Sequence, residues 1–128
     1  MKHLIATERE DQIALVEWAS YHTILKRYMF HIPNEGKRHP IVGHNLVRMG
    51  LKKGVADFFL AYPSSPTGLR GRLFYGLFLE LKRRKLFKVS KEQQIFLDDM
   101  FAQGYAAHIA YGFDEGREII LNYLNERK

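Results

Sequence analysis

The sequence predicts an α/β domain with a central mixed sheet flanked by helices. Two capping-box patterns, Thr7-Glu8-Arg9-Glu10 and Ser90-Lys91-Glu92-Gln93, mark helix starts on either side of two apolar, strand-like runs at 55–62 and 73–81. In chain order the predicted elements are helix, strand, short helix, strand, strand, helix, strand and helix. This alternation is typical of a sheet covered by helices.

The first helix begins at Thr7 and is expected to run to about Arg27. Residues that recur at helical spacing form one face of it, and this face is apolar in its middle and polar at its N-terminal end. We expect the polar end to lend groups to a site. The face carries Glu8, Gln12, Leu15, Ala19 and His22.

Three further helical segments follow. Residues 46–49 form one or two turns closed by Gly50, and the helix that starts at Ser90 ends near Gly104, a residue suited to a helix C-terminus. Asp114 is expected to cap the last helix. The core face of this helix carries Ile119, Ile120, Tyr123 and Leu124.

Four segments predict strands. Residues 28–32 form a short strand ended by a turn signal at 33–36, and 55–62 form a strand stopped by the prolines of 63–66. Residues 63–71 read as an exposed, mobile loop before the buried strand 73–81. Residues 105–111 form the last strand. No repeat or linker divides the chain, so we expect one domain over 1–128.

Composition narrows the class of protein. The 128 residues are 46% hydrophobic, which favours a folded core. No apolar run is long enough to cross a bilayer, and the N-terminus has no signal-like stretch. The absence of cysteine excludes disulfides and thiolate metal sites and fits the cytoplasm.

The charge balance points to a polyanionic partner. Lysine and arginine number 20 against 14 acidic residues, and a surplus of this kind favours nucleic acid through counterion release. General solubility explains the same surplus, so charge alone leaves both interpretations open.

Two acids and a lysine form the main chemical pattern. Asp57 lies near the start of one predicted strand and Glu80-Leu81-Lys82 at the end of another. Alternation along a strand places Glu80 and Lys82 on one face and turns Leu81 to the core. A hairpin across 63–71 would bring Asp57 beside Glu80.

Such a pair of carboxylates offers the oxygen ligands that Mg²⁺ or Mn²⁺ prefers, and the Leu81 carbonyl can add a third. A bound metal polarises a phosphate and activates water, while Lys82 orients water or offsets charge. The alternative is that Glu80 and Lys82 are solvated strand-end residues and Asp57 is a turn residue. The apolar neighbours of both acids favour the metal site, because an unpaired buried carboxylate is costly.

Together with their neighbours these residues resemble the VRR-NUC domain family, a branch of the PD-(D/E)xK nuclease superfamily, in its stand-alone form. The matching segments occur in the family's order over nearly the whole chain. Ala56 departs from the pattern, because the family usually has proline there. The segments are 8–12 (EREDQ), 32–38 (IPNEGKR), 50–58 (GLKKGVADF), 76–82 (GLFLELK), 89–93 (VSKEQ) and 104–105 (GY).

The resemblance implies a restriction-endonuclease-like fold and a divalent-metal DNA endonuclease. Its catalytic residues would be Asp57, Glu80 and Lys82, with Gln93 beside the active site and Glu8 approaching the metal or its water shell. Stand-alone members are similar to enzymes that cleave branched, Holliday-junction-like DNA as homodimers, and two-fold symmetry suits the cutting of two strands.

Several alternatives stay open. Gln93 is equally well explained as the capping partner of Ser90, and Glu8 as a first-turn acid. His22 is expected to be a packed, hydrogen-bonded residue. The alternative functions are those of a non-catalytic DNA-binding module, a flap or single-strand nuclease, or an RNA-binding or toxin-type protein. Basic residues that we expect to contact DNA are Lys37, Arg38, Lys52, Lys53, Arg83 and Arg84.

Overall fold

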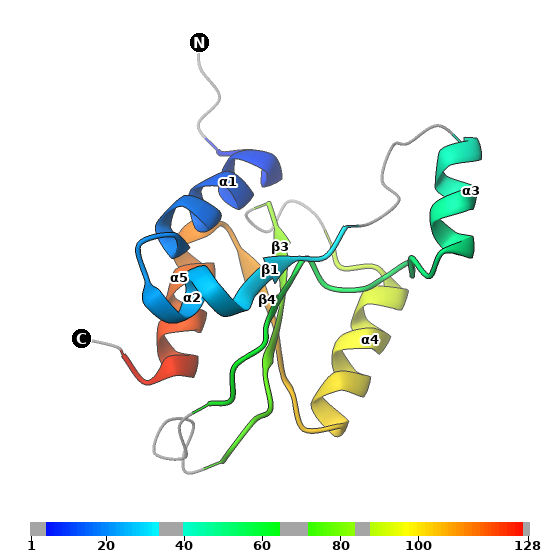
Figure 1. Cartoon of the computed structure of the whole chain (residues 1–128). Helices are drawn as coiled ribbons and strands as arrows, with labels where there is room; N and C mark the ends of the chain where they lie inside the picture. Colours follow the sequence, from blue (N-terminus) through cyan, green and yellow to red (C-terminus); the bar gives the residue numbers. More distant parts are fainter. Residues whose placement is uncertain (1–4, 34–39, 65–71, 84–87, 127–128) are drawn as a thin grey trace.

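The computed structural model describes residues 5–33, 40–64, 72–83 and 88–126. A four-stranded sheet lies between two layers of helices (Figure 1). Helices α1 (Glu8–Ala19) and α5 (Phe113–Leu124) pack on one face, and α4 (Lys91–Ala102) packs on the other. The predicted fold class is confirmed.

The sheet has the order β1-β2-β3-β4. β1 (Met29–His31) and β2 (Phe58–Leu60) are antiparallel, as are β2 and β3 (Leu77–Lys82), whereas β3 and β4 (Ala106–Tyr111) are parallel. The sheet is therefore mixed, as predicted. Three of the strands fall within the predicted segments, and β3 ends at Lys82, one residue beyond the predicted strand 73–81.

The first predicted helix is two helices. Thr7 forms the expected capping box with Glu10 at the start of α1. However, α1 ends at Ala19, and a second helix, α2 (Thr23–Tyr28), begins after His22. His22 is extended (φ −110°, ψ 126°), and its Nδ1 accepts hydrogen bonds from the Ile24 and Leu25 backbone N–H groups at 3.1 and 3.4 Å. The prediction of one helix to Arg27 is wrong because His22 caps a second helix.

The last helix also differs from its prediction. α5 starts after Gly112, which has φ 98° and no side-chain cap. Asp114 lies in the first turn, where its Oδ1 is 3.7 Å from Arg117 Nη2. The buried Asp11 of α1 caps the helix instead, because its Oδ1 accepts a hydrogen bond from the Phe113 N–H at 3.1 Å.

The remaining helices extend the predictions. The short helix predicted at 46–49 is α3 (Pro40–Arg48), which ends before Gly50 with φ 114°. Ser90 caps the N-terminus of α4, and the helix ends at Ala102, near Gly104, as predicted. No helix in the described ranges has the length and apolar character needed to cross a membrane.

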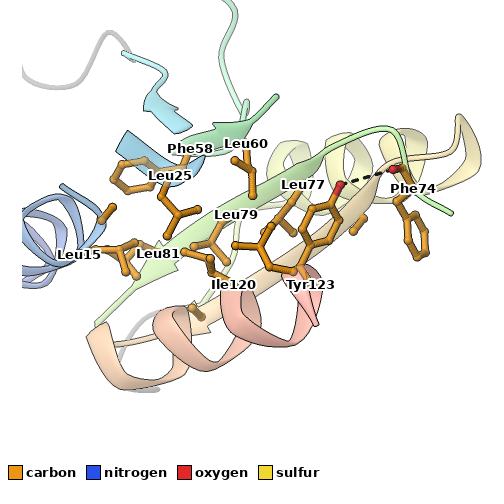
Figure 2. Close-up of a cluster of buried hydrophobic side chains, with 14 residues drawn as sticks. Leu15, Leu25, Phe58, Leu60, Phe74, Leu77, Leu79, Leu81, Ile120 and Tyr123 are labelled. Carbon is orange, nitrogen blue, oxygen red and sulfur yellow. Dashed lines mark hydrogen bonds between the residues drawn. The ribbon is translucent and has the colours of Figure 1, made fainter. Parts of the chain in front are cut away.

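The main core lies between the sheet and the α1–α5 layer (Figure 2). Leu77, Leu79 and Leu81 of β3 point to this face and meet Ile120 and Tyr123 of α5. The Tyr123 hydroxyl donates to the carbonyl oxygen of Tyr62 at 2.6 Å. The alternation therefore turns Phe78, Glu80 and Lys82 to the opposite face, below α4.

The segment after β2 is buried at the last residue that the structure describes before position 65. Ser64 is buried, and its Oγ accepts a hydrogen bond from the Phe74 N–H at 2.8 Å. The predicted exposure of 63–71 is therefore wrong at Ser64. Residues 65–71 lie outside the described ranges, as do residues 34–36 of the turn predicted at 33–36.

Candidate active site

The antiparallel pairing of β2 with β3 brings the two predicted acids together. Phe58 lies opposite Leu79, so the preceding residue, Asp57, extends the register toward Glu80. Both side chains belong to the sheet face that α4 covers. The hairpin expected from the sequence is therefore present.

Asp57 is held by contacts to two strands. Its Oδ2 accepts a hydrogen bond from the Leu81 N–H at 2.7 Å. Its carbonyl oxygen lies 2.7 Å from the Ile32 backbone nitrogen and 2.8 Å from the His31 Nδ1, and both are within hydrogen-bonding distance. The carboxylate is thus fixed at the end of β3, with the Leu81 backbone beside it.

Glu80 is almost completely buried, with 2% of its surface exposed. Its Oε2 accepts a hydrogen bond from Gln93 Nε2 at 2.6 Å and lies 3.5 Å from Lys82 Nζ. Its Oε1 is buried and has no hydrogen-bond partner among the described residues. One oxygen is therefore compensated and the other is available to a ligand.

Gln93 makes both contacts that the sequence left as alternatives. Its Oε1 accepts from the Ser90 N–H and its own N–H donates to Ser90 Oγ, each at 3.1 Å. Its Nε2 reaches Glu80 at the same time. Because Ser90 fixes the amide oxygen, the amide nitrogen points to Glu80.

Burial makes both acids reluctant to ionise. Burial is the largest cause that raises the pKa of Asp57, and the hydrogen bond from Leu81 opposes it. The pKa of Glu80 is raised to about 7, first by burial and then by the Asp57 carboxylate, while Lys82 lowers it. A cation placed between the two acids would stabilise both charged forms.

Glu8 lies exposed in the first turn of α1. Its charge contributes to the raised pKa of Asp57 and of Glu80, which places it within electrostatic range of both. Within the described ranges, however, no three His, Asp or Glu side chains gather closely enough to hold a metal ion. Glu8 therefore does not complete a three-carboxylate cage with the pair.

The residues present fit a divalent cation all the same. Glu80 Oε1 is buried without a described partner, the Asp57 charge acts on the same carboxyl group, and hard cations accept carboxylate, carbonyl and water oxygens together. A Mg²⁺ ion keeps several coordinated water molecules when the protein supplies few ligands. Two carboxylates and a backbone carbonyl are a sufficient protein contribution for Mg²⁺.

The structure places only part of the predicted basic surface. Lys52 and Lys53 are exposed in the segment between α3 and β2. Arg83 is half-buried, its Nη2 donates to the carbonyl of Ile5 at 3.5 Å, and its Nε is buried without a partner among the described residues. The other three predicted contacts, Lys37, Arg38 and Arg84, lie outside the described ranges.

The sequence did not predict the roles of two polar residues, Asp11 and His31. Asp11 is buried on α1, three positions after the exposed Glu8, and it caps α5. His31 supports the Asp57 carbonyl because β1 pairs with β2. The sequence carries no signal for that pairing.

Comparison with solved structures identifies the fold. No protein-family model matches the sequence, and no curated protein matches it. A solved structure described as a VRR_NUC domain protein superposes with a TM-score of 0.77 and 21% identity, over 97% of this chain and 93% of that chain. The chain therefore has the fold of a VRR_NUC domain protein, which is the fold that the sequence resemblance implied.

Proposed function

We propose that this chain is a VRR-NUC family nuclease that hydrolyses phosphodiester bonds in DNA with a divalent metal. The observation that carries the proposal is the placement of Asp57, Glu80 and Lys82 on one sheet face, with a buried Glu80 oxygen that has no described partner. The VRR_NUC neighbour supports a nuclease-type fold.

Asp57 and Glu80 would hold the metal, Mg²⁺ or Mn²⁺, with the Leu81 carbonyl as a further ligand and Glu8 acting through the water shell. When bound, the metal would polarise a phosphate oxygen and lower the pKa of a water molecule. The hydrogen bond from Leu81 holds Asp57 in place for this task.

Lys82 and Gln93 act on the same centre from the protein side. The Lys82 ammonium lies 3.5 Å from Glu80 Oε2, where it offsets negative charge that develops on the phosphate and orients the attacking water. Gln93 donates to the same oxygen at 2.6 Å and keeps the Glu80 side chain in one orientation. It is the fourth residue of the proposed machinery.

Branched, Holliday-junction-like DNA is the proposed substrate and a homodimer the proposed assembly. The net charge of +6 supports a nucleic-acid partner. A two-fold dimer presents two active sites to two strands, which suits symmetric cutting of a junction. Exposed Lys52 and Lys53 are the described candidates for phosphate contacts.

The proposal is tested by incubating the protein with duplex, flap, fork and four-way-junction DNA in Mg²⁺, Mn²⁺ or EDTA. Asp57→Ala and Lys82→Ala should each lower metal-dependent cleavage at least a hundredfold, because each removes charge from the reacting centre. The exposed Asp99 and Lys88 supply the matched controls Asp99→Ala and Lys88→Ala, which should cleave like the wild type.

Each outcome has one meaning. No metal-dependent cleavage of any of the four substrates contradicts the nuclease, and salt-dependent binding without cutting identifies a non-catalytic DNA-binding module. Undiminished cleavage in both Asp57→Ala and Lys82→Ala contradicts the site. Preference for flap over junction DNA, or a monomer in sedimentation, contradicts the junction-resolving dimer.

A further inference from the structure

Helix α3 stands apart from the sheet and from the other helices (Figure 1). It packs extensively against no other described helix or strand. Val47 and Met49, at its C-terminal end, are 48% and 82% exposed, and a Cβ added at Gly50 would meet open space among the described residues. Together with the segment that follows it, residues 40–56, this helix forms an arm with several sides open to a partner, which we call the α3 arm.

The α3 arm is fixed at its other end, beside the proposed active site. Gly54 packs against Glu92 of α4, Ala56 is 2% exposed, and Asp57 follows directly. Because Lys53 precedes Asp57 by four positions, their Cα atoms lie at most about 14 Å apart. The open helix is therefore joined to the carboxylates by a short segment that is anchored at the site.

The charge of the α3 arm suits a polyanion. Arg48, Lys52 and Lys53 are all exposed, and the arm contains no acidic residue. His44 and Asn45 are also exposed, and helical spacing puts both on the same side of α3 as Arg48. This side of the helix therefore offers a cation together with hydrogen-bonding groups.

The dimensions of α3 match the major groove of DNA. Its 9 residues span about 14 Å at 1.5 Å per residue, and the major groove is about 12 Å wide and admits one α-helix. A helix that packs along its own fold cannot enter a groove, whereas the open sides of α3 allow it. Duplex RNA carries the same phosphates, but its major groove is deep and narrow.

We propose that the α3 arm binds the DNA duplex that adjoins the phosphate at Asp57 and Glu80, with α3 lying in the major groove. The inference rests on the proposed nuclease function and deepens it, because it identifies duplex DNA beside the cleavage point as the part of the substrate that the protein holds. Arg48 lies on the side of α3 that faces the groove. Lys52 and Lys53 contact phosphates between the groove and the active site.

Binding in EDTA, followed by fluorescence anisotropy, tests the arm without cleavage. The probes are a DNA duplex and an RNA duplex of equal length and sequence, and the variant is Arg48→Glu. Its matched control is Arg27→Glu, because Arg27 is also an exposed arginine in the last turn of a short helix, α2. The two variants carry the same net charge, so any difference between them depends on position.

The wild type should bind the DNA duplex more tightly than the RNA duplex. Arg48→Glu should weaken DNA binding at least about tenfold and lower the salt dependence of log Kd by about one, since a phosphate or base contact is lost, while RNA binding changes less than about threefold. Arg27→Glu should change neither by more than about twofold. Arg48→Ala, which places no acid at the end of α3, should act in the same direction if Arg48→Glu unfolds the helix.

Three results would overturn the proposal. Equal weakening by Arg27→Glu would show that net charge alone matters, and equal weakening of both duplexes by Arg48→Glu would mean a phosphate contact outside the groove. Unchanged binding with an altered oligomeric state in sedimentation would make α3 an interface between copies. Selective loss of DNA binding in a protein that cleaves nothing in Mg²⁺ supports the arm and contradicts the nuclease, whereas metal-dependent cleavage with any of the three results contradicts the arm alone.

Discussion

Glu80 destabilises the folded chain through its buried carboxyl group, and it is also a proposed metal ligand. Its carboxyl group is buried below α4, with Gln93 and Lys82 on one oxygen and no described partner on the other. Without a cation, the folded chain favours the protonated form of this side chain, and its pKa of about 7 expresses that preference.

The metal-free protein should therefore lose stability as pH rises from about 5 to 7. Below the ordinary pKa of 4.5 both folded and unfolded chains hold the proton. Between 4.5 and about 7 only the folded chain holds it, so the free energy of unfolding falls through this window and levels off above it. The contribution of Glu80 should be about 1–3 kcal/mol.

Urea unfolding in EDTA at several pH values checks this expectation against Glu80→Gln. The variant keeps the shape of the side chain and removes its charge, so its stability should decline less over the same window. It should also exceed the wild type at pH 8. Parallel curves for the two proteins would show that Glu80 titrates normally.

At the residue scale the sequence predicted that Asp57 and Glu80 lie side by side, but it did not predict the contacts around them. Alternation along β3 predicted that Glu80 and Lys82 share a face, and the hairpin predicted Asp57 beside them. The contact of Gln93 with Glu80 depends on where α4 crosses the sheet. Local spacing carries no information on such a crossing, which is why capping and site remained alternatives for Gln93.

The first turn of α4 joins helix capping to the proposed site. Ser90→Ala removes only the cap and should cost about 1 kcal/mol of stability. Gln93→Glu keeps the capping box, because glutamate is the usual partner at this position, but it turns a carboxylate toward Glu80. We expect Gln93→Glu to remain folded while its cleavage rate falls at least tenfold.

Urea unfolding and single-turnover cleavage, measured on both variants, separate the two roles. Gln94→Glu changes charge in the same way on the exposed side of the helix and serves as the control. If Gln93→Glu cleaves like the control, then Gln93 only caps the helix.

The segment before β2 is held against the same helix by Gly54. This residue has φ +86°, and a Cβ added to it would lie 2.7 Å from Glu92 Cβ. Gly54→Ala should therefore lower the free energy of unfolding by about 2–4 kcal/mol and weaken cleavage, because the segment leads directly into Asp57.

Comparison with Gly50→Ala separates the cost of packing at Gly54 from the cost of backbone strain. Gly50 also has a positive φ, +114°, but no described residue lies within 4 Å of an added Cβ. Its cost in chemical denaturation should be limited to backbone strain and stay below that of Gly54→Ala. Equal costs would mean that contact with Glu92 contributes nothing.

At the element scale, the sequence patterns located the helical and strand segments but did not show where the first helix is interrupted. The apolar period of the first helix continues past Ala19, so it gave no sign of the end at that residue. The break comes from His22, whose ring accepts two backbone hydrogen bonds and pairs with Glu126 near the C-terminus at 2.6 Å. The second partner lies more than a hundred positions away and is invisible to local reasoning.

For the whole molecule, the order of elements predicted the mixed sheet, but not which strand would lie at its edge. Within the described ranges β1 pairs with β2 alone, and this placement creates the His31 support of Asp57. The likeness to a VRR_NUC domain protein at 21% identity indicates that the fold tolerates extensive sequence change. Asp57, Glu80 and the first turn of α4 with Gln93 therefore lie together at one corner of the sheet.

If that corner binds a divalent cation, the cation must stabilise the entire fold, because the unfolded chain does not hold Asp57 and Glu80 together. Mg²⁺ at about 100 times its dissociation constant should add about 2.7 kcal/mol and raise Tm by several degrees. Asp57→Asn keeps the acceptor for the Leu81 N–H but removes the charge, so its Tm should not respond to Mg²⁺. Asp99→Asn, on the exposed surface of α4, should respond like the wild type. Equal Mg²⁺-induced rises in wild type and Asp57→Asn would place the cation elsewhere on the molecule.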